Sequence, residues 1–147
     1  IPEKDETSLV HGDYRIGNVI YKQGSEKIVA LLDWELSTLG NPYSDLGYLL
    51  HTHFIPFGQR HGLKNLDLKK ENIPTVEEIV NVYCNEKEID IVDPYFYVVL
   101  SMFRSTAILE GVYSRYVKGN ESSPNAKEIG KDVEPLAKAT YQIIKNM

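Results

Sequence analysis

Polar side chains suited to phosphate or metal chemistry are concentrated in one stretch, LVHGDYRIGNVIY, which lies between apolar residues. They are His11, Asp13, Arg15 and Asn18. One more carboxylate, Asp33, ends the apolar run that follows. Mg²⁺ binds oxygen ligands and often shares substrate phosphates with a protein, so an amide oxygen and a carboxylate suit it. The pattern therefore indicates a magnesium site, with Asp13 available to accept a proton from a hydroxyl group.

Two short strands are expected to bring these groups together. Residues 18–21 and 27–34 are β-branched and apolar, and the polar residues between them suit a turn, which predicts a β-hairpin. Asn18 and Asp33 then lie at adjacent strand ends, and Asp13 follows the end of an earlier strand. Two carboxylates about 4 Å apart repel each other by roughly 4 kcal/mol at an effective dielectric constant of about 20, and a bound dication removes that penalty.

The helices that support this hairpin are predicted from capping residues and apolar spacing. One helix begins near 42–45, and a second begins at Thr75, where Glu78 completes a capping box. The longest apolar segment is 95–117, and a last helix follows Pro124, with Pro135 expected to kink or split it. The predicted fold class is α+β and mainly α, with one small β-hairpin and four to five helices.

The 95–117 helix carries apolar residues on nearly every face, so we expect it to be central and mostly buried. Arg104 and Glu110 interrupt it. Because buried charges are costly unless they are paired, each of the two is expected to have a partner.

Composition limits the classes of function. The 147 residues are enough for one domain, which we take as 1–147 with a polar connector at 1–8. The net charge of −5 argues against nucleic acid as a partner, and no apolar run approaches the roughly 20 residues that cross a membrane. Cys84 is the single cysteine, which fits a reducing, intracellular compartment, cytoplasmic or organellar.

Three segments, HGDYRIGN, LLDWE and NPYSDLG, resemble the catalytic core of the aminoglycoside phosphotransferase-like kinases, the small-molecule relatives of protein kinases. The spacing from Asp13 to Asn18 is that of the protein-kinase pattern H-R-D-x-x-x-x-N, with Gly12 in place of arginine, and DWE stands where D-F-G would. The resemblance implies the C-terminal lobe of a protein-kinase-like fold, with ATP and Mg²⁺ as cofactors and a small-molecule hydroxyl substrate.

The tail segment FRSTAILEGVYSRYVKGNESS is similar to the kinase-like domain that is joined to acyl-CoA dehydrogenases, family members ten and eleven. This similarity extends the resemblance over nearly the whole chain. It implies that the acceptor is a hydroxylated acyl group, such as a hydroxyacyl-CoA.

The resemblance also implies a role for each polar residue. Asp13 would be the catalytic base, while Asn18 and Asp33 would hold Mg²⁺ on the nucleotide phosphates. Arg15 would lie near the transferred phosphoryl group, where a guanidinium spreads charge well. A solvated loop cation remains the alternative for Arg15.

Three further residues have supporting roles under the same resemblance. Glu35 would assist the metal through water, although a solvent-facing side chain is the stronger alternative. His11 would pack behind the loop. Asp45 would bond the loop backbone from the next helix, a role that is compatible with a helix N-cap.

A complete kinase of this class also has an N-terminal lobe with a phosphate-covering loop and a lysine. Ten residues before His11 cannot hold it, and no G-x-G-x-x-G is present. We therefore expect these 147 residues to be an inactive piece of a longer enzyme. We also expect an apolar surface around the hairpin through which the piece self-associates.

Other functions remain open at this point. One is a non-catalytic kinase-like binding module, and another is a metal-dependent phosphoesterase, for which we find neither a nucleophile nor a second metal cluster. A zinc site at His51, His53 and His61 is disfavoured because the first two would not share a helix face. A wall of the substrate pocket is the better interpretation of that segment.

Overall fold

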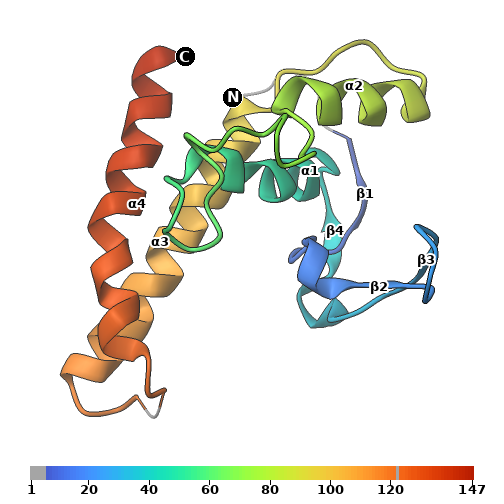
Figure 1. Ribbon diagram of the computed structural model, residues 1–147. Helices are drawn as coiled ribbons and strands as arrows, with labels where there is room; N and C mark the ends of the chain where they lie inside the picture. The colour runs from blue at the N-terminus through green and yellow to red at the C-terminus, as the bar shows by residue number, and fades with distance from the viewer. Residues whose placement is uncertain (1–5, 122) are drawn as a thin grey trace.

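The computed structural model describes residues 6–121 and 123–147, and it is mainly helical with a small strand region at one side (Figure 1). The four strands are β1 (Ser8–Val10), β2 (Val19–Tyr21), β3 (Ile28–Leu31) and β4 (Thr38–Gly40). The four α-helices are α1 (Tyr43–Leu50), α2 (Val76–Lys87), α3 (Tyr95–Val117) and α4 (Ala126–Asn146). The predicted fold class, α+β and mainly α, is confirmed.

The strands form two antiparallel pairs. The predicted hairpin is present as β2–β3, with Val19 opposite Leu31. The second pair joins β1 to β4, with Leu9 opposite Leu39. The sequence did not predict β4, because its three residues show no alternating pattern. They form a strand only because they pair with β1, which is distant in the sequence.

Local signals placed three helix starts correctly. Helix α1 begins at Tyr43, and α2 follows a complete capping box between Thr75 and Glu78. Helix α3 has the predicted bounds, and Asp93 accepts a hydrogen bond from the Tyr95 backbone N–H at its start. The expectation that Pro135 splits the last helix was wrong: α4 runs unbroken through it. Packing of α4 along α3 offsets the one hydrogen bond that proline removes.

The core lies between α1, α3 and α4, with α2 across one end (Figure 1). Its most buried side chains are Leu50, Cys84, Val98 and Met102. Only one side of α3 is buried, however, since Phe103 is 67% exposed on the other. The prediction of a mostly buried α3 was therefore wrong, and Glu110 needs no partner because it is exposed.

The start of the chain is tied to the helices. Residues 1–5 of the predicted connector lie outside the described residues, but its remaining part is ordered against the fold. Glu6 accepts hydrogen bonds from the Tyr43 hydroxyl (2.8 Å) and the Lys87 ammonium (3.1 Å), and Ser8 begins β1. Residues 6–8 are therefore part of the folded structure and not of a connector. Within the described residues, no helix is both long and apolar enough to cross a membrane.

Candidate active site

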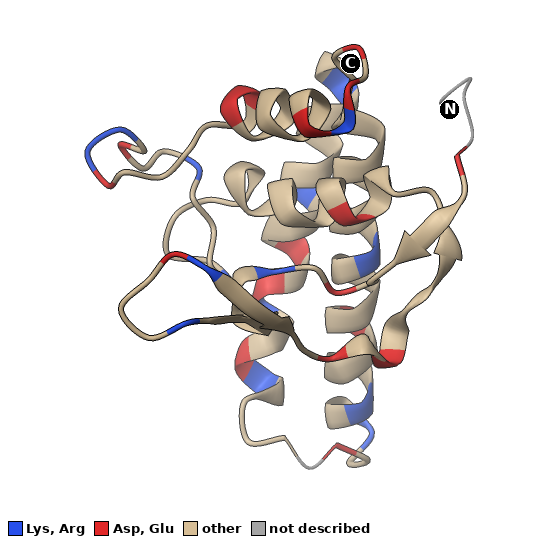
Figure 2. Cartoon of the chain, turned by 90° about the vertical axis from the view of Figure 1, so that its right-hand side faces the viewer, with Lys and Arg blue, Asp and Glu red and all other residues tan. Residues whose placement is uncertain are grey.

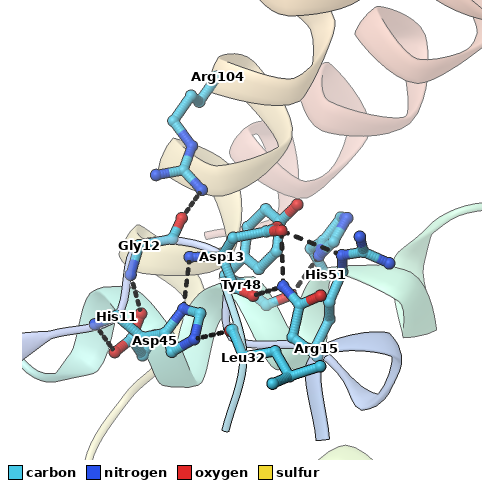
Figure 3. A network of polar contacts seen from close by, with 10 residues as sticks. His11, Gly12, Asp13, Arg15, Leu32, Asp45, Tyr48, His51 and Arg104 are labelled. Atoms are coloured by element: carbon cyan, nitrogen blue, oxygen red, sulfur yellow. Dashed lines mark hydrogen bonds and ion pairs between the residues drawn. The ribbon is translucent and has the colours of Figure 1, made fainter. Parts of the chain in front are cut away.

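The loop after β1 is fixed in an unusual turn. Gly12 has a φ of +84°, and a β-carbon there would lie 2.6 Å from the Leu36 carbonyl oxygen, so only glycine fits. From α1, the Asp45 carboxylate accepts hydrogen bonds from the backbone N–H groups of His11 (2.7 Å) and Gly12 (2.9 Å) (Figure 3). Asp45 lies in the first turn of α1, and the N-cap is Pro42. The loop is thus anchored to the helical part of the molecule.

His11 is buried behind this loop and joins it to the end of β3. Its Nδ1 accepts from the Asp13 backbone N–H (3.2 Å), and its Nε2 lies 2.8 Å from the Leu32 carbonyl oxygen. Both contacts are satisfied only when the proton is on Nε2, which donates to Leu32. His11 therefore sets the distance between the loop and the hairpin.

Asp13 points into a set of hydrogen-bond donors (Figure 3). Its Oδ2 accepts from the Asn18 amide (2.8 Å) and from Arg15 Nε (3.1 Å), and the Tyr48 hydroxyl lies beside the carboxylate (Figure 3). Burial raises the pKa of the Asp13 carboxyl, but the bonds from Tyr48, Arg15 and Asn18 outweigh burial and lower it below its usual value. Asp13 is therefore ionised at neutral pH and able to accept a hydrogen bond from a hydroxyl.

The backbone pairing of the hairpin places Asn18 and Asp33 at adjacent strand ends. The Leu32 N–H donates to the Asn18 carbonyl oxygen (2.8 Å), so Asp33 is the next residue beyond the pair. Asp33 adopts a left-handed conformation (φ 68°, ψ 52°), which is uncommon outside glycine and is enriched at functional sites. Although Asp33 is the N-cap of the 3₁₀ helix Trp34–Leu36, its side chain makes no capping hydrogen bond.

The donor set fits a magnesium ion. Buried Asn18 uses its amide nitrogen for the Asp13 carboxylate and carbonyl, so its Oδ1 would be the atom that faces a cation. Asp33 is exposed at the adjacent strand end, and its carboxylate is not used as a cap. No three His, Cys, Asp or Glu side chains form a metal cluster within the described residues. An ion here would therefore take few protein ligands and complete its shell with water or phosphate oxygens.

The other predicted site residues lie around this centre. Arg15 bonds Asp13 through Nε, and its side chain is 53% exposed, which leaves its remaining donors open to a ligand. Glu35 is exposed on the 3₁₀ helix. The structure thus brings Asp13, Arg15 and Asn18 into direct contact and places Asp33 one residue beyond the backbone pair.

Sequence reading missed two residues at the site. Tyr48 lies one helical turn after Asp45 on α1, and its hydroxyl lies beside the Asp13 carboxylate (Figure 3). Arg104 on α3 donates to the Gly12 carbonyl oxygen (2.6 Å). The i,i+3 spacing from Asp45 was the available signal for Tyr48. Arg104 was expected to have a partner, but its identity depends on how α3 packs.

The three histidines make separate contacts. His51 Nδ1 bonds the Tyr48 carbonyl, His53 Nε2 lies 2.9 Å from the Pro74 carbonyl oxygen, and His61 is exposed in a left-handed turn. Burial lowers the pKa of His51, which keeps its ring neutral at pH 7. His51 packs against the ring of Tyr48 (Figure 3).

The sequence also matches known proteins. The model of the phosphotransferase enzyme family matches residues 1–74, half of the chain, including the loop and the hairpin. The chain belongs to this family. A Ralstonia eutropha JMP134 protein, provisionally called an aminoglycoside phosphotransferase, has a crystal structure that matches this phosphotransferase-family chain with a TM-score of 0.88 and 38% identity. The match covers 95% of this chain and 43% of that one.

Curated relatives match this phosphotransferase-family chain along nearly its whole length. Mouse acyl-CoA dehydrogenase family member 10 is 40% identical over 96% of the chain, and human family member 11 is 37% identical over 99%. The chain spans only 14% and 19%, respectively, of these two proteins. The resemblance stated from the sequence, including that of the tail segment, is confirmed.

Proposed function

We propose that this chain is the catalytic C-terminal lobe of an ATP- and Mg²⁺-dependent enzyme that phosphorylates a hydroxyl group of a small molecule. The family and the fold support phosphotransfer in general. The observation that carries the proposal is the contact between the Asp13 carboxylate and the Asn18 amide, beside the strand end that bears Asp33. A base and two oxygen ligands at this spacing are what phosphoryl transfer to a hydroxyl requires.

Each side chain has one task in this proposal. Asp13 orients the acceptor hydroxyl and takes up its proton as its oxygen bonds the γ-phosphorus of ATP and the bond to the β-phosphate oxygen breaks, so that ADP leaves. Asn18 Oδ1 and the Asp33 carboxylate hold the metal, with Glu35 reaching it only through water. When bound, Mg²⁺ neutralises the charge that develops on the nucleotide phosphates. The open donors of Arg15 bind an oxygen of the transferred group, since a guanidinium spreads phosphoryl charge.

We propose a hydroxyacyl-CoA as the acceptor. Support comes from relatives named as acyl-CoA dehydrogenases, which contain a segment similar to this entire chain within much longer proteins. A phosphotransferase segment in such proteins is best explained by an acyl substrate that both activities share. The neutral ring of His51 and the ring of Tyr48 would then form the wall against which the acyl group lies.

We further propose that residues 1–147 alone turn over poorly. They contain no glycine-rich phosphate loop, and they correspond to less than half of the solved relative. Phosphoryl transfer depends on groups that position the nucleotide and stabilise its charge from both sides. Residues that supply only one side of the nucleotide site therefore support little catalysis. Brisk turnover by the 147 residues alone would contradict this part.

The test uses the complete protein in which this chain occurs, incubated with Mg-ATP and a panel of hydroxyacyl-CoA, free hydroxy acid and aminoglycoside acceptors. We expect phosphorylated acyl product with the wild type, and Asp13→Asn to lower kcat by about 10²- to 10⁴-fold because the base is lost. Asp132→Asn on α4 is the matched control and should leave kcat unchanged. Absence of transfer to any acceptor, with ATP still bound, would instead support a non-catalytic binding module.

A further inference from the structure

Arg104 joins helix α3 to the catalytic loop across 92 positions of sequence. Its Nη2 donates to the Gly12 carbonyl oxygen at 2.6 Å, and its guanidinium carbon lies 4.8 Å from the centre of the Tyr48 ring (Figure 3). A guanidinium can make both contacts at once because it is planar, stacks on an aromatic face and presents several donors.

Both polar groups of the Gly12 backbone are therefore held by helices. Its N–H donates to Asp45 on α1, and its carbonyl accepts from Arg104 on α3. The two peptide groups on either side of Gly12 are thus fixed, and the residue that immediately follows is Asp13. Because Gly12 is the most permissive residue type and has a positive φ here, this loop would otherwise have wide conformational freedom.

Tyr48 connects the same support to the carboxylate itself. Its ring contacts the Arg104 guanidinium and the His51 ring (4.8 Å between centroids), while its hydroxyl lies beside the Asp13 carboxylate (Figure 3). The His51 Nδ1 contact with the Tyr48 carbonyl holds the segment in place as well. Arg104 thereby holds the backbone beside the base, and Tyr48 supports the carboxylate that Asn18 and Arg15 bond.

We propose that Arg104 and Tyr48 are positioning residues, which together hold the Asp13 carboxylate in line for the acceptor hydroxyl. The inference rests on the proposed function for the role of Asp13, but the structural support itself is independent of it. Arg104 contacts the backbone just before Asp13, and Tyr48 lies against the Asp13 carboxylate, so each acts on the transition state through Asp13. Loss of either should lower kcat and kcat/KM equally and leave the KM for ATP unchanged.

The activity experiment uses the complete protein with Mg-ATP and the acceptor on which the wild type acts. Tyr48→Phe keeps the ring and removes the hydroxyl, and Arg104→Ala removes the support of Gly12. We expect kcat to fall by about 10- to 100-fold in each, the size expected when a reacting group is misplaced by about 1 Å. Added guanidinium should partly restore Arg104→Ala, because a free guanidinium can occupy the site between Gly12 and Tyr48.

Matched controls come from the far part of α3. Tyr116→Phe and Arg115→Ala change the same residue types, and Arg115 pairs with Glu121 away from the site. Neither control should change kcat, and guanidinium should not affect Arg115→Ala. Unchanged kcat in Tyr48→Phe and Arg104→Ala would overturn the inference, and so would a rise in the KM for ATP with kcat preserved.

A second readout needs no activity and separates this inference from the proposed function. Hydrogen–deuterium exchange of the peptide over residues 9–18 should be faster in Arg104→Ala than in the wild type, with exchange in α4 unchanged. If the wild type shows no transfer but this difference is present, the proposed function fails and the support of the loop stands. Equal exchange of the loop in the two proteins overturns the inference. If exchange rises throughout the molecule in Arg104→Ala, the same measurement is made on Tyr48→Phe. Faster exchange of residues 9–18 in that variant supports the inference, and exchange equal to the wild type overturns it.

Discussion

The helical part and the strand part of this molecule are packed very differently. Leu50, Val98 and Met102 in the helices are completely buried, whereas Ile20, Val29 and Leu39 in the strands are 42%, 56% and 75% exposed. The strands are also almost free of charge, as the tan ribbon of β2 and β3 in Figure 2 shows, while charged residues of both signs are interspersed along the helices. The strand part therefore presents an apolar surface that the described residues do not cover.

The candidate active site lies between these two parts. Asp45, Tyr48 and Arg104 reach the loop from the well-packed helices, whereas Asn18 and Asp33 come from the poorly packed hairpin. The base is thus held from both sides, by the helices and by Asn18, whereas the metal ligands depend on a hairpin with few buried apolar contacts. The comparison teaches that the site joins a well-packed part to a poorly packed one, and the following substitutions test how much each part contributes.

The largest difference is expected between one leucine in each part. Leu50→Ala should lower the free energy of unfolding by about 2 to 5 kcal/mol, because it leaves a cavity in the core. Leu39→Ala, the matched change in β4, should alter it by only about 0.5 kcal/mol because Leu39 is already exposed to water. Urea unfolding of both variants measures the two values, and equal losses would mean that the strand part contributes as much as the helices.

A smaller loss of stability is expected from a substitution at Asp45, which joins the helices to the loop before the hairpin. In Asp45→Asn, one oxygen that accepts a backbone N–H becomes an amide group, so a hydrogen bond to His11 or Gly12 is lost. Stability should fall by about 1.5 to 3 kcal/mol, the range for bonds to a charged group. Thermal unfolding checks this, with exposed Asp90→Asn as the control. If both variants match the wild type, the Asp45 contacts do not anchor the loop.

The smallest effect on stability is expected on the apolar strand surface, but there association should change. We propose that the 147-residue chain self-associates through the β2–β3 face, and that Val29→Lys shifts it toward monomer because a charge cannot be buried there cheaply. Val82→Lys on α2, where Val82 is 64% exposed, is the control and should keep the wild-type state. A wild-type chain that sediments as a monomer at every concentration would show that this face does not bind a second copy.

Much of this structure was predictable from short-range patterns. The apolar segment 95–117 predicted α3, the Thr75 capping box predicted the start of α2, and the β-branched runs predicted the hairpin. These signals are local, since a cap or a turn is satisfied within a few residues of sequence. The spacing of Asp13 and Asn18 likewise predicted a contact that the structure shows.

What the sequence could not give depends on distant packing. The exposure of one side of α3 follows from which helices neighbour it, and its apolar residues alone suggested burial all round. The contact of Arg104 with Gly12 requires that α3 pass the loop, which nothing in either segment specifies. The strand β4 exists only because β1 pairs with it. In each case the deciding contact joins residues far apart in the chain.

Anomalous diffraction from a crystal of the complete protein with Mn²⁺ and a non-hydrolysable ATP analogue tests the central claim most directly. Mn²⁺ takes the same oxygen ligands as Mg²⁺ and locates the ion without ambiguity. We expect the anomalous peak at ligand distance from both Asn18 Oδ1 and the Asp33 carboxylate, with Asp13 facing the terminal phosphate. A peak held by other residues, with Asn18 and Asp33 turned apart, would contradict the claim that these side chains form the metal site.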